Sequence, residues 1–350
     1  MPSMGTLGVR APMGWLGPSR PVEDPVVVLD GGFVAWAGPR SSLPAGVAEP
    51  DELVEVDGFV MPGAVDRHVH IALADPRAVV RGGATAVRDL GWPPGEIFPL
   101  ADASETPSFD GPLIRAVGPM LTCADGYPTR AGWAAPGTGL EVRGAEEAAA
   151  ATMEVLSRND LRVVKVALNV DAGPTLSDQE LLAICDTAHA QGALVTVHAQ
   201  GGGQAERAVG AGADEFAHCP WSERLSDDLI EAMATRTRIV STLDIHSYGA
   251  STPELTVAID NLRRFLLAGG TVAYGTDLGN GPIPPGIHPG EVAHLFRAGL
   301  SPEGILRALT FRPLEPGEPA DLVVLGQNPL ETVDAYPDVR VVVRAGRRVR

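Results

Sequence analysis

Short apolar runs alternate with helical segments over most of the chain, and this alternation limits the folds open to it. The predicted strands after His70 are 84–89, 113–117, 162–168, 194–198, 215–218, 239–243 and 272–277. The predicted helices are 145–158, 177–191, 204–209, 226–234, 253–268, 290–298 and 302–309. With the strand that leads to His70, this makes about eight strand units over roughly 250 residues, as in a (β/α)8 barrel. A doubly wound sheet is the main alternative, but no GxGxxG turn follows a strand.

Both ends of the chain carry β patterns instead. Asp30-Gly31-Gly32 separates two apolar runs, which is a strong β-hairpin signal. Residues 53–56 form a further expected strand, and residues 1–24, rich in Pro and Gly, are expected to form an irregular lead-in.

The C-terminal strands, expected at 320–325, 339–343 and 347–349, need partners, and the N-terminal hairpin could supply them. We therefore predict an α/β chain: a (β/α)8 TIM barrel over 62–312, inserted into a small β-sandwich domain built from both chain termini. That composite domain would take residues 1–61 and 313–350.

Charge and cysteine usage restrict the partners and the compartment. The net charge of -17 argues against nucleic-acid binding, which needs a basic face. The three cysteines show no CxxC spacing, which favours a reducing compartment. We find no signal-peptide h-region in the first twenty residues and no apolar run long enough to span a membrane. A cytoplasmic protein with a small-molecule substrate is expected, and homo-oligomer formation stays open.

The first barrel strand ends in His68-Val69-His70. Side chains alternate faces along a strand, so the two imidazoles project together. Neutral imidazole nitrogen is a good ligand for divalent metals. The pair alone is weak evidence, because two His separated by one residue also occur by chance.

Four more polar residues lie in or at the ends of later strands: Lys165, His198, His218 and Asp277. Each has an ordinary alternative: a lysine that reaches solvent, satisfied core histidines and an Asx turn. However, Lys165 lies among Val and Leu residues and would be costly to bury as an ammonium, so deprotonation or reaction with carbon dioxide to a carbamate is favoured. Active sites of barrels lie at the C-terminal ends of the strands. The candidate residues of these five strands are therefore expected to meet at one end of the barrel.

These motifs together resemble the amidohydrolase superfamily, nearest its imidazolonepropionase and Xaa-Pro dipeptidase-like branch. The resemblance covers nearly the whole chain from Val26. The matching phrases are Met61-Pro62-Gly63, His68-Val69-His70, Ala86-Val87-Arg88-Asp89-Leu90-Gly91, Gly126-Tyr127-Pro128, Val164-Lys165-Val166, Val197-His198-Ala199, Glu215-Phe216-Ala217-His218, Gly275-Thr276-Asp277 and Pro316–Leu325.

The resemblance implies a metal-dependent hydrolase with two divalent metal ions, zinc being the expected element. His68, His70 and Asp277 would bind the more buried ion, and His198 and His218 the second. A carbamate on Lys165 would bridge the ions, with a hydroxide between them. Asp277 would take the proton of that hydroxide and pass it to the leaving group.

Two stretches depart from the family pattern. The link from His70 to Gly83 is short, so the first barrel helix is expected to be reduced to 76–81 or distorted. A short helical segment usual in the family is absent between Thr310 and Leu314. Both departures lie outside the predicted metal ligands and affect loop shape rather than chemistry.

The resemblance also narrows the reaction. Related deaminases carry a Glu three residues after the fifth-strand His and lack the bridging Lys, whereas here Gly201 stands at that position. Hydrolysis of amide or peptide-like C–N bonds is therefore expected first and of lactones second. The predicted substrate-binding residues are Tyr127, Arg130, Trp221, His246, Tyr248 and His288. Arg130 could clasp a substrate carboxylate, or could be an ordinary surface arginine.

Three alternatives stay open at this point. The same scaffold could carry a lactonase or esterase, or a mononuclear deaminase. A non-catalytic scaffold protein is disfavoured because none of the expected ligands is missing.

Overall fold

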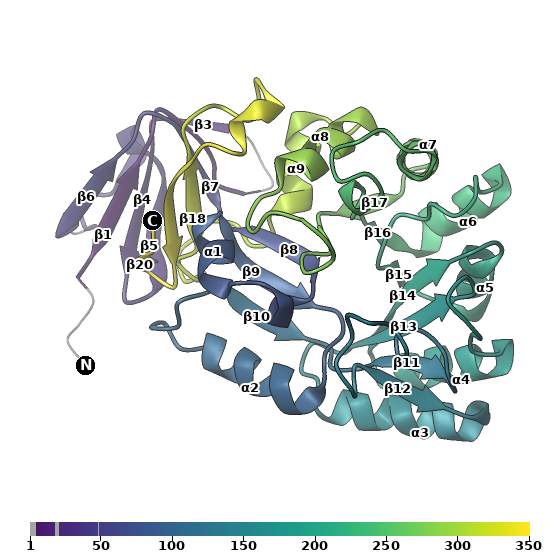
Figure 1. Ribbon diagram of the computed structural model, residues 1–350. Helices are drawn as coiled ribbons and strands as arrows, with labels where there is room; N and C mark the ends of the chain where they lie inside the picture. Colours follow the sequence, from purple (N-terminus) through teal and green to yellow (C-terminus); the bar gives the residue numbers. More distant parts are fainter. Residues whose placement is uncertain (1–4, 18–20, 48) are drawn as a thin grey trace.

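The computed structural model describes residues 5–17, 21–47 and 49–350. Parallel strands surrounded by helices make up one side of the molecule, and two sheets from the chain termini make up the other (Figure 1).

The first terminal sheet has the order β5-β4-β1-β6. Its strands are β1 Leu7–Arg10, β4 Pro25–Asp30, β5 Phe33–Pro39 and β6 Glu52–Glu55. The second has the order β20-β19-β18-β7-β2-β3. Its strands are β2 Met13–Trp15, β3 Pro21–Glu23, β7 Phe59–Pro62, β18 Leu322–Leu325, β19 Val339–Arg344 and β20 Arg347–Arg348.

The hairpin at Asp30-Gly31-Gly32 is confirmed, because β4 and β5 pair antiparallel on either side of it. The irregular lead-in is wrong for the described residues, since β1, β2 and β3 fall within it. These strands have three or four residues each, too few to show a periodic pattern. The parts of the lead-in at 1–4 and 18–20 lie outside the described residues.

The predicted partner of the C-terminal strands is also wrong. β18 pairs antiparallel with β7, with Val324 opposite Val60, while the hairpin lies in the other sheet. The two sheets nevertheless share one buried apolar cluster, to which β4 contributes Val27 and β19 contributes Val341. Both ends of the chain therefore contribute to a common core.

The parallel strands carry the predicted polar residues. They are β8 Ala64–Val69, β9 Ala84–Asp89, β10 Leu113–Ala116, β11 Met120–Cys123, β12 Gly139–Val142, β13 Val163–Asn169, β14 Leu194–Gln200, β15 Glu215–Phe216, β16 Arg238–Val240 and β17 Thr271–Ala273. Within the described residues they form two sheets, β10-β9-β8 and β12-β11-β13-β14-β15-β16-β17, rather than a closed barrel.

The chain beyond β17 connects these two sheets. Asp277 N donates to His68 O at 2.7 Å, and Thr242 N donates to Gly275 O at 3.0 Å. A Cβ at Gly275 would lie against Val240 and the backbone of His68, so only glycine allows this approach. On the opposite side, β10 pairs with β9, and β11, which follows it closely, pairs with β13.

The helices lie around the parallel strands (Figure 1). They are α1 Pro76–Arg81, α2 Pro94–Ser104, α3 Gly144–Ser157, α4 Asp178–Ala190, α5 Gln204–Ala211, α6 Asp227–Arg236, α7 Pro253–Leu267, α8 Pro289–Arg297 and α9 Pro302–Leu309. The short first helix is confirmed as α1. Helix α2 was not predicted because it contains Pro99, a residue that normally disrupts a helix interior. In the described part of the chain, no helix is both long and apolar enough to cross a membrane.

Candidate active site

A cavity of about 240 Å³ opens at the C-terminal ends of the parallel strands. It is lined by all six residues predicted as metal ligands: His68, His70, Lys165, His198, His218 and Asp277. These come from β8, β13, β14 and the segments after β15 and β17, so the expectation that separate strand ends converge agrees with the fold.

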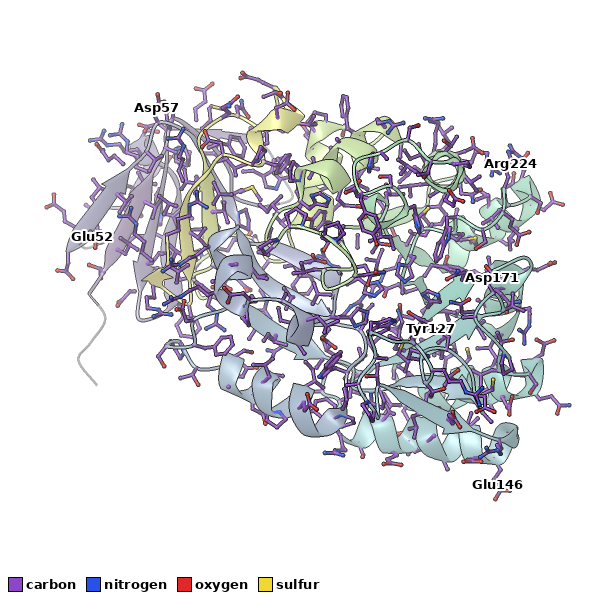
Figure 2. All side chains as sticks on the ribbon, viewed as in Figure 1. Glu52, Asp57, Tyr127, Glu146, Asp171 and Arg224 are labelled. Atoms are coloured by element: carbon purple, nitrogen blue, oxygen red, sulfur yellow. The ribbon has the colours of Figure 1, made fainter. Side chains whose placement is uncertain are left out.

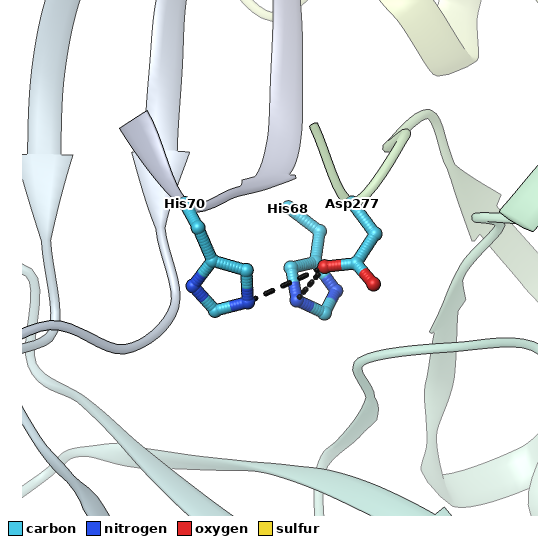
Figure 3. A group of neighbouring side chains, drawn as sticks. All are labelled: His68, His70 and Asp277. Carbon is cyan, nitrogen blue, oxygen red and sulfur yellow. Dashed lines mark ion pairs between the residues drawn. The ribbon is translucent and has the colours of Figure 1, made fainter. Parts of the chain in front are cut away.

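His68, His70 and Asp277 form a compact group (Figure 3). Asp277 Oδ1 lies 3.1 Å from His68 Nε2 and 3.3 Å from His70 Nε2. Asp277 has a φ of 58°, a left-handed conformation that is uncommon for an aspartate and frequent at functional sites. Two imidazole nitrogens and a carboxylate oxygen within 4.8 Å of one another suit one divalent metal ion.

Hydrogen bonds on the far ring nitrogen orient three of the histidines. His68 Nδ1 donates to Ala217 O at 2.7 Å, and His70 Nδ1 donates to Gly91 O at 3.0 Å. His218 Nδ1 lies 2.8 Å from Thr242 Oγ1. Such partners fix the tautomer of metal-binding histidines and leave Nε2 as the ligand atom.

The second predicted group lies beside the first. The ring of His218 lies 4.5 Å from that of His68 and 4.8 Å from that of His198, measured between centroids. Burial lowers the pKa of all three histidines, which keeps them in the neutral form that binds metals.

Lys165 is the most unusual residue of the cavity. Its side chain is fully buried, and among the described residues its Nζ has no hydrogen-bond partner. Burial lowers the pKa of Lys165 to about 7. A buried amine without a partner is costly, so its position among four histidines and Asp277 fits a group that binds metal.

Burial alone would raise the pKa of Asp277, but His68 and His70 lower it well below its ordinary value. Asn280 Nδ2 donates to Asp277 Oδ2 at 2.9 Å and holds the carboxylate in place. Asp277 is therefore an oriented anion that can accept a proton.

Sequence analysis missed an ion cluster of Arg88, Glu215 and Arg238, in which Arg88 and Glu215 are buried and Arg238 is partly exposed. Arg88 Nη2 and Arg238 Nε each lie 2.5 Å from a carboxylate oxygen of Glu215, which is 1% exposed. The sequence does show a charged residue in each of two predicted strands, Arg88 in 84–89 and Glu215 in 215–218. It gives no sign that these two residues pair with each other.

Three of the predicted substrate-binding residues line the cavity: Tyr127, Trp221 and His246. Tyr127 stacks on His198 with ring centroids 5.1 Å apart, and Trp221 lies 4.3 Å from His246. Figure 2 shows Tyr127 inside the outline of the molecule, whereas Glu146 projects from its edge. Eight further lining residues were not predicted: Met120, Trp133, Asn169, Gln200, Ile245, Gly279, Asn280 and Gly281.

The other three predicted substrate-binding residues do not line the cavity. Arg130 is 74% exposed in its side chain and pairs with Asp125. His288 is buried, and its Nε2 lies 2.7 Å from Asp244 Oδ2. Tyr248 lies at the rim, where its Oη is 3.4 Å from Asn280 Oδ1.

The chain is similar to a known protein family. A model of the amidohydrolase family matches residues 59–349, most of the chain. The chain belongs to the amidohydrolase family. This confirms the resemblance seen in the motifs and places the chain among hydrolases that act on carbon–nitrogen bonds.

Individual relatives agree with this assignment. An uncharacterized protein of Mycobacterium tuberculosis is 28% identical over 331 residues, 83% of this chain and 85% of the relative. Imidazolonepropionase of Rhodococcus jostii is 41% identical over 76 residues, 21% of this chain, and the match spans only 18% of that enzyme. A solved Xaa-Pro dipeptidase with methionine bound in its active site has 20% identity and a TM-score of 0.79, covering 98% of this chain and 99% of that one. This last likeness shows that the two proteins share a fold.

Proposed function

We propose that this amidohydrolase uses two divalent metal ions, zinc being the expected element, to hydrolyse an amide or peptide-like bond. The observation that carries the proposal is Lys165, whose buried Nζ has no hydrogen-bond partner among the described residues and lies in the same cavity as His68, His198 and Asp277. A carbamate on Lys165 would convert this amine into a bidentate anion. That anion could serve both groups of predicted metal ligands. His68, His70 and Asp277 would hold one ion, and His198 and His218 the other.

The ions would supply a Lewis acid for the substrate carbonyl and an activated water. Asp277 would accept the proton of that water at its carboxylate and return it to the leaving nitrogen. The hydrogen bond from Asn280 would keep the Asp277 carboxylate in one orientation while it carries the proton. Tyr127 and Trp221 would limit the access of bulk water to the reacting bond.

The same proposal includes the architecture. Strands β8, β9, β10 with β11, and β13 to β17 would be the eight strands of a (β/α)8 barrel over residues 62–312. Residues 1–61 and 313–350 would form one composite β-sandwich domain. The shared apolar cluster of the two terminal sheets supports this division.

The names of two similar proteins favour hydrolysis of a carbon–nitrogen bond in the substrate. One matched enzyme is an imidazolonepropionase, and one protein of the same fold is a Xaa-Pro dipeptidase. Esters and lactones are the second substrate class, because the same carbonyl chemistry serves them.

Metal content measured by elemental mass spectrometry tests the proposal, on protein prepared with bicarbonate and without a chelator. About two ions per chain, together with hydrolysis of an amide substrate, would support it. No bound metal after addition of zinc or manganese would overturn it.

A single-ion site is the second candidate. It is favoured by one observation: in the described part of the chain, only His68, His70 and Asp277 bring their ligand atoms within 4.8 Å of one another. About one ion per chain would support this candidate and would make deamination a reaction to test.

A further inference from the structure

The wall of the cavity beyond the predicted metal ligands carries no charged side chain among the residues described. Its polar members are side-chain amides, a phenol, two indoles and an imidazole, and its apolar members include Met120 and Ile245. Burial lowers the pKa of His246 to about 4, so this imidazole adds no positive charge at neutral pH. A substrate carboxylate that met this part of the wall would lose its water without gaining an ammonium or guanidinium partner there.

Two of the amide side chains in this wall, Asn169 and Gln200, are hydrogen-bonded to each other. Asn169 Nδ2 donates to Gln200 Oε1 at 2.9 Å, and Gln200 Nε2 lies 3.5 Å from Asp171 Oδ2. Asp171 is exposed, so it places a negative charge next to the amide pair. This arrangement can exchange hydrogen bonds with a neutral amide, and it repels an anion.

Aromatic rings form the remaining wall. Tyr127 and Trp133 lie 6.2 Å apart between ring centroids, and Trp221 lies 4.3 Å from His246. Flat faces of this kind bind planar rings by stacking. The guanidinium that could have clasped a carboxylate, Arg130, points outward and pairs with Asp125.

We propose that the part of the substrate that enters the cavity is an uncharged, ring-bearing amide, and that the site rejects the same amide with a carboxylate on the ring. This inference rests on the proposed function, because it concerns the substrate of the same site. It differs from the expectation of a carboxylate clasp at Arg130.

The test compares two probes that differ only in the carboxylate, acetanilide and 4-acetamidobenzoate, on the metal-loaded protein. We expect kcat/KM for acetanilide to exceed that for 4-acetamidobenzoate by about tenfold or more, the kind of rejection that an unpaired buried group produces. Ile245→Arg, which adds a guanidinium to the wall, should narrow this ratio. Leu267→Arg, at a side chain that is 81% exposed on α7, should leave the ratio unchanged.

Binding of the same two probes is measured by quenching of tryptophan fluorescence, since Trp133 and Trp221 line the cavity. If acetanilide binds more tightly but neither probe is hydrolysed, the inference stands and amide hydrolysis fails. Equal affinities, a preference for the carboxylate, or no binding of either probe would overturn the inference. The comparison of the two probes on the wild-type protein tests the inference even if Ile245→Arg does not fold.

Discussion

Arg88 of β9 and Glu215 of β15 form a buried ion pair between the two sheets of parallel strands. Arg88 Nη2 lies 2.5 Å from Glu215 Oε1. Arg238 pairs with the second carboxylate oxygen from the adjacent strand β16. The three residues link β9, β15 and β16 through one carboxylate. Breaking such a buried pair by removing one partner is costly, so the cluster makes folding sensitive to acid.

This cluster predicts how stability depends on pH. Burial opposes ionisation, but Arg88 and Arg238 prevail and lower the pKa of Glu215 from 4.5 to about 2. The carboxylate therefore stabilises the fold fully above pH 4.5, and this contribution is lost as the pH falls towards 2. The loss should amount to about 3 kcal/mol of unfolding free energy, measured by urea titration of the metal-free protein.

Glu215→Gln provides the control for this prediction. It should be less stable at pH 7 because Arg88 loses its partner, but its unfolding free energy should fall less between pH 4.5 and 2. Identical pH dependence in the variant and the wild type would show that Glu215 is not the titrating group.

Asp277→Asn should leave most of the fold intact and remove the proposed proton acceptor. We expect turnover to fall about 10²- to 10⁴-fold, the usual contribution of a general base. The measurement is kcat on an amide substrate, with metal content determined on the same sample. Asp186→Asn, at an exposed position of α4, is the matched control and should keep full turnover. A fully active Asp277→Asn variant would contradict the proposed role.

The sequence predicted which polar residues line the cavity better than it predicted the contacts around them. His68 and His70 follow from the alternation of side chains along one strand, and the expected order of parallel strands brings Lys165 of β13 and His198 of β14 to the same cavity. Contacts between distant strands carry no such local signal. The pairing of Arg88 with Glu215 joins strands of two different sheets, and that of Val324 with Val60 joins two strands far apart in the chain.

Loop residues show the same limit. Tyr127 and Arg130 are three residues apart in one loop, yet Tyr127 faces the cavity and Arg130 faces solvent. Neither helical nor strand periodicity applies there, so the sequence could not separate them. Short strands were missed for a related reason, because the three residues of β2 give no measurable period.

That difference between Tyr127 and Arg130 makes a prediction about substrate binding. Arg130→Ala should change kcat/KM by less than about twofold, because an exposed ion pair contributes little. Tyr127→Ala should lower kcat/KM by about tenfold, since it removes a stacking face from the cavity wall and from His198. Steady-state kinetics on one amide substrate would check both. If kcat/KM fell strongly in Arg130→Ala but not in Tyr127→Ala, Arg130 would bind a substrate carboxylate after all.

Lys165→Met separates the folding role of Lys165 from its proposed chemical role. Methionine has a similar volume and no charged group, so the substitution removes a buried amine that finds no hydrogen-bond partner in the part of the chain that the structure describes. We expect the metal-free variant to be as stable as the wild type or about 1–2 kcal/mol more stable, measured by urea unfolding. Turnover should be lost, and bicarbonate, which should increase metal uptake by the wild type, should have no effect on the variant.

Lys165→Ala is the companion variant, and it should also be inactive but less stable than Lys165→Met, because it leaves a cavity. Full turnover in either variant would show that the amine is not needed for the reaction. Strong destabilisation of Lys165→Met in the metal-free protein would show that the fold itself depends on this lysine. Loss of activity with unchanged or improved stability is the outcome expected of a side chain that is buried for its chemistry rather than for packing.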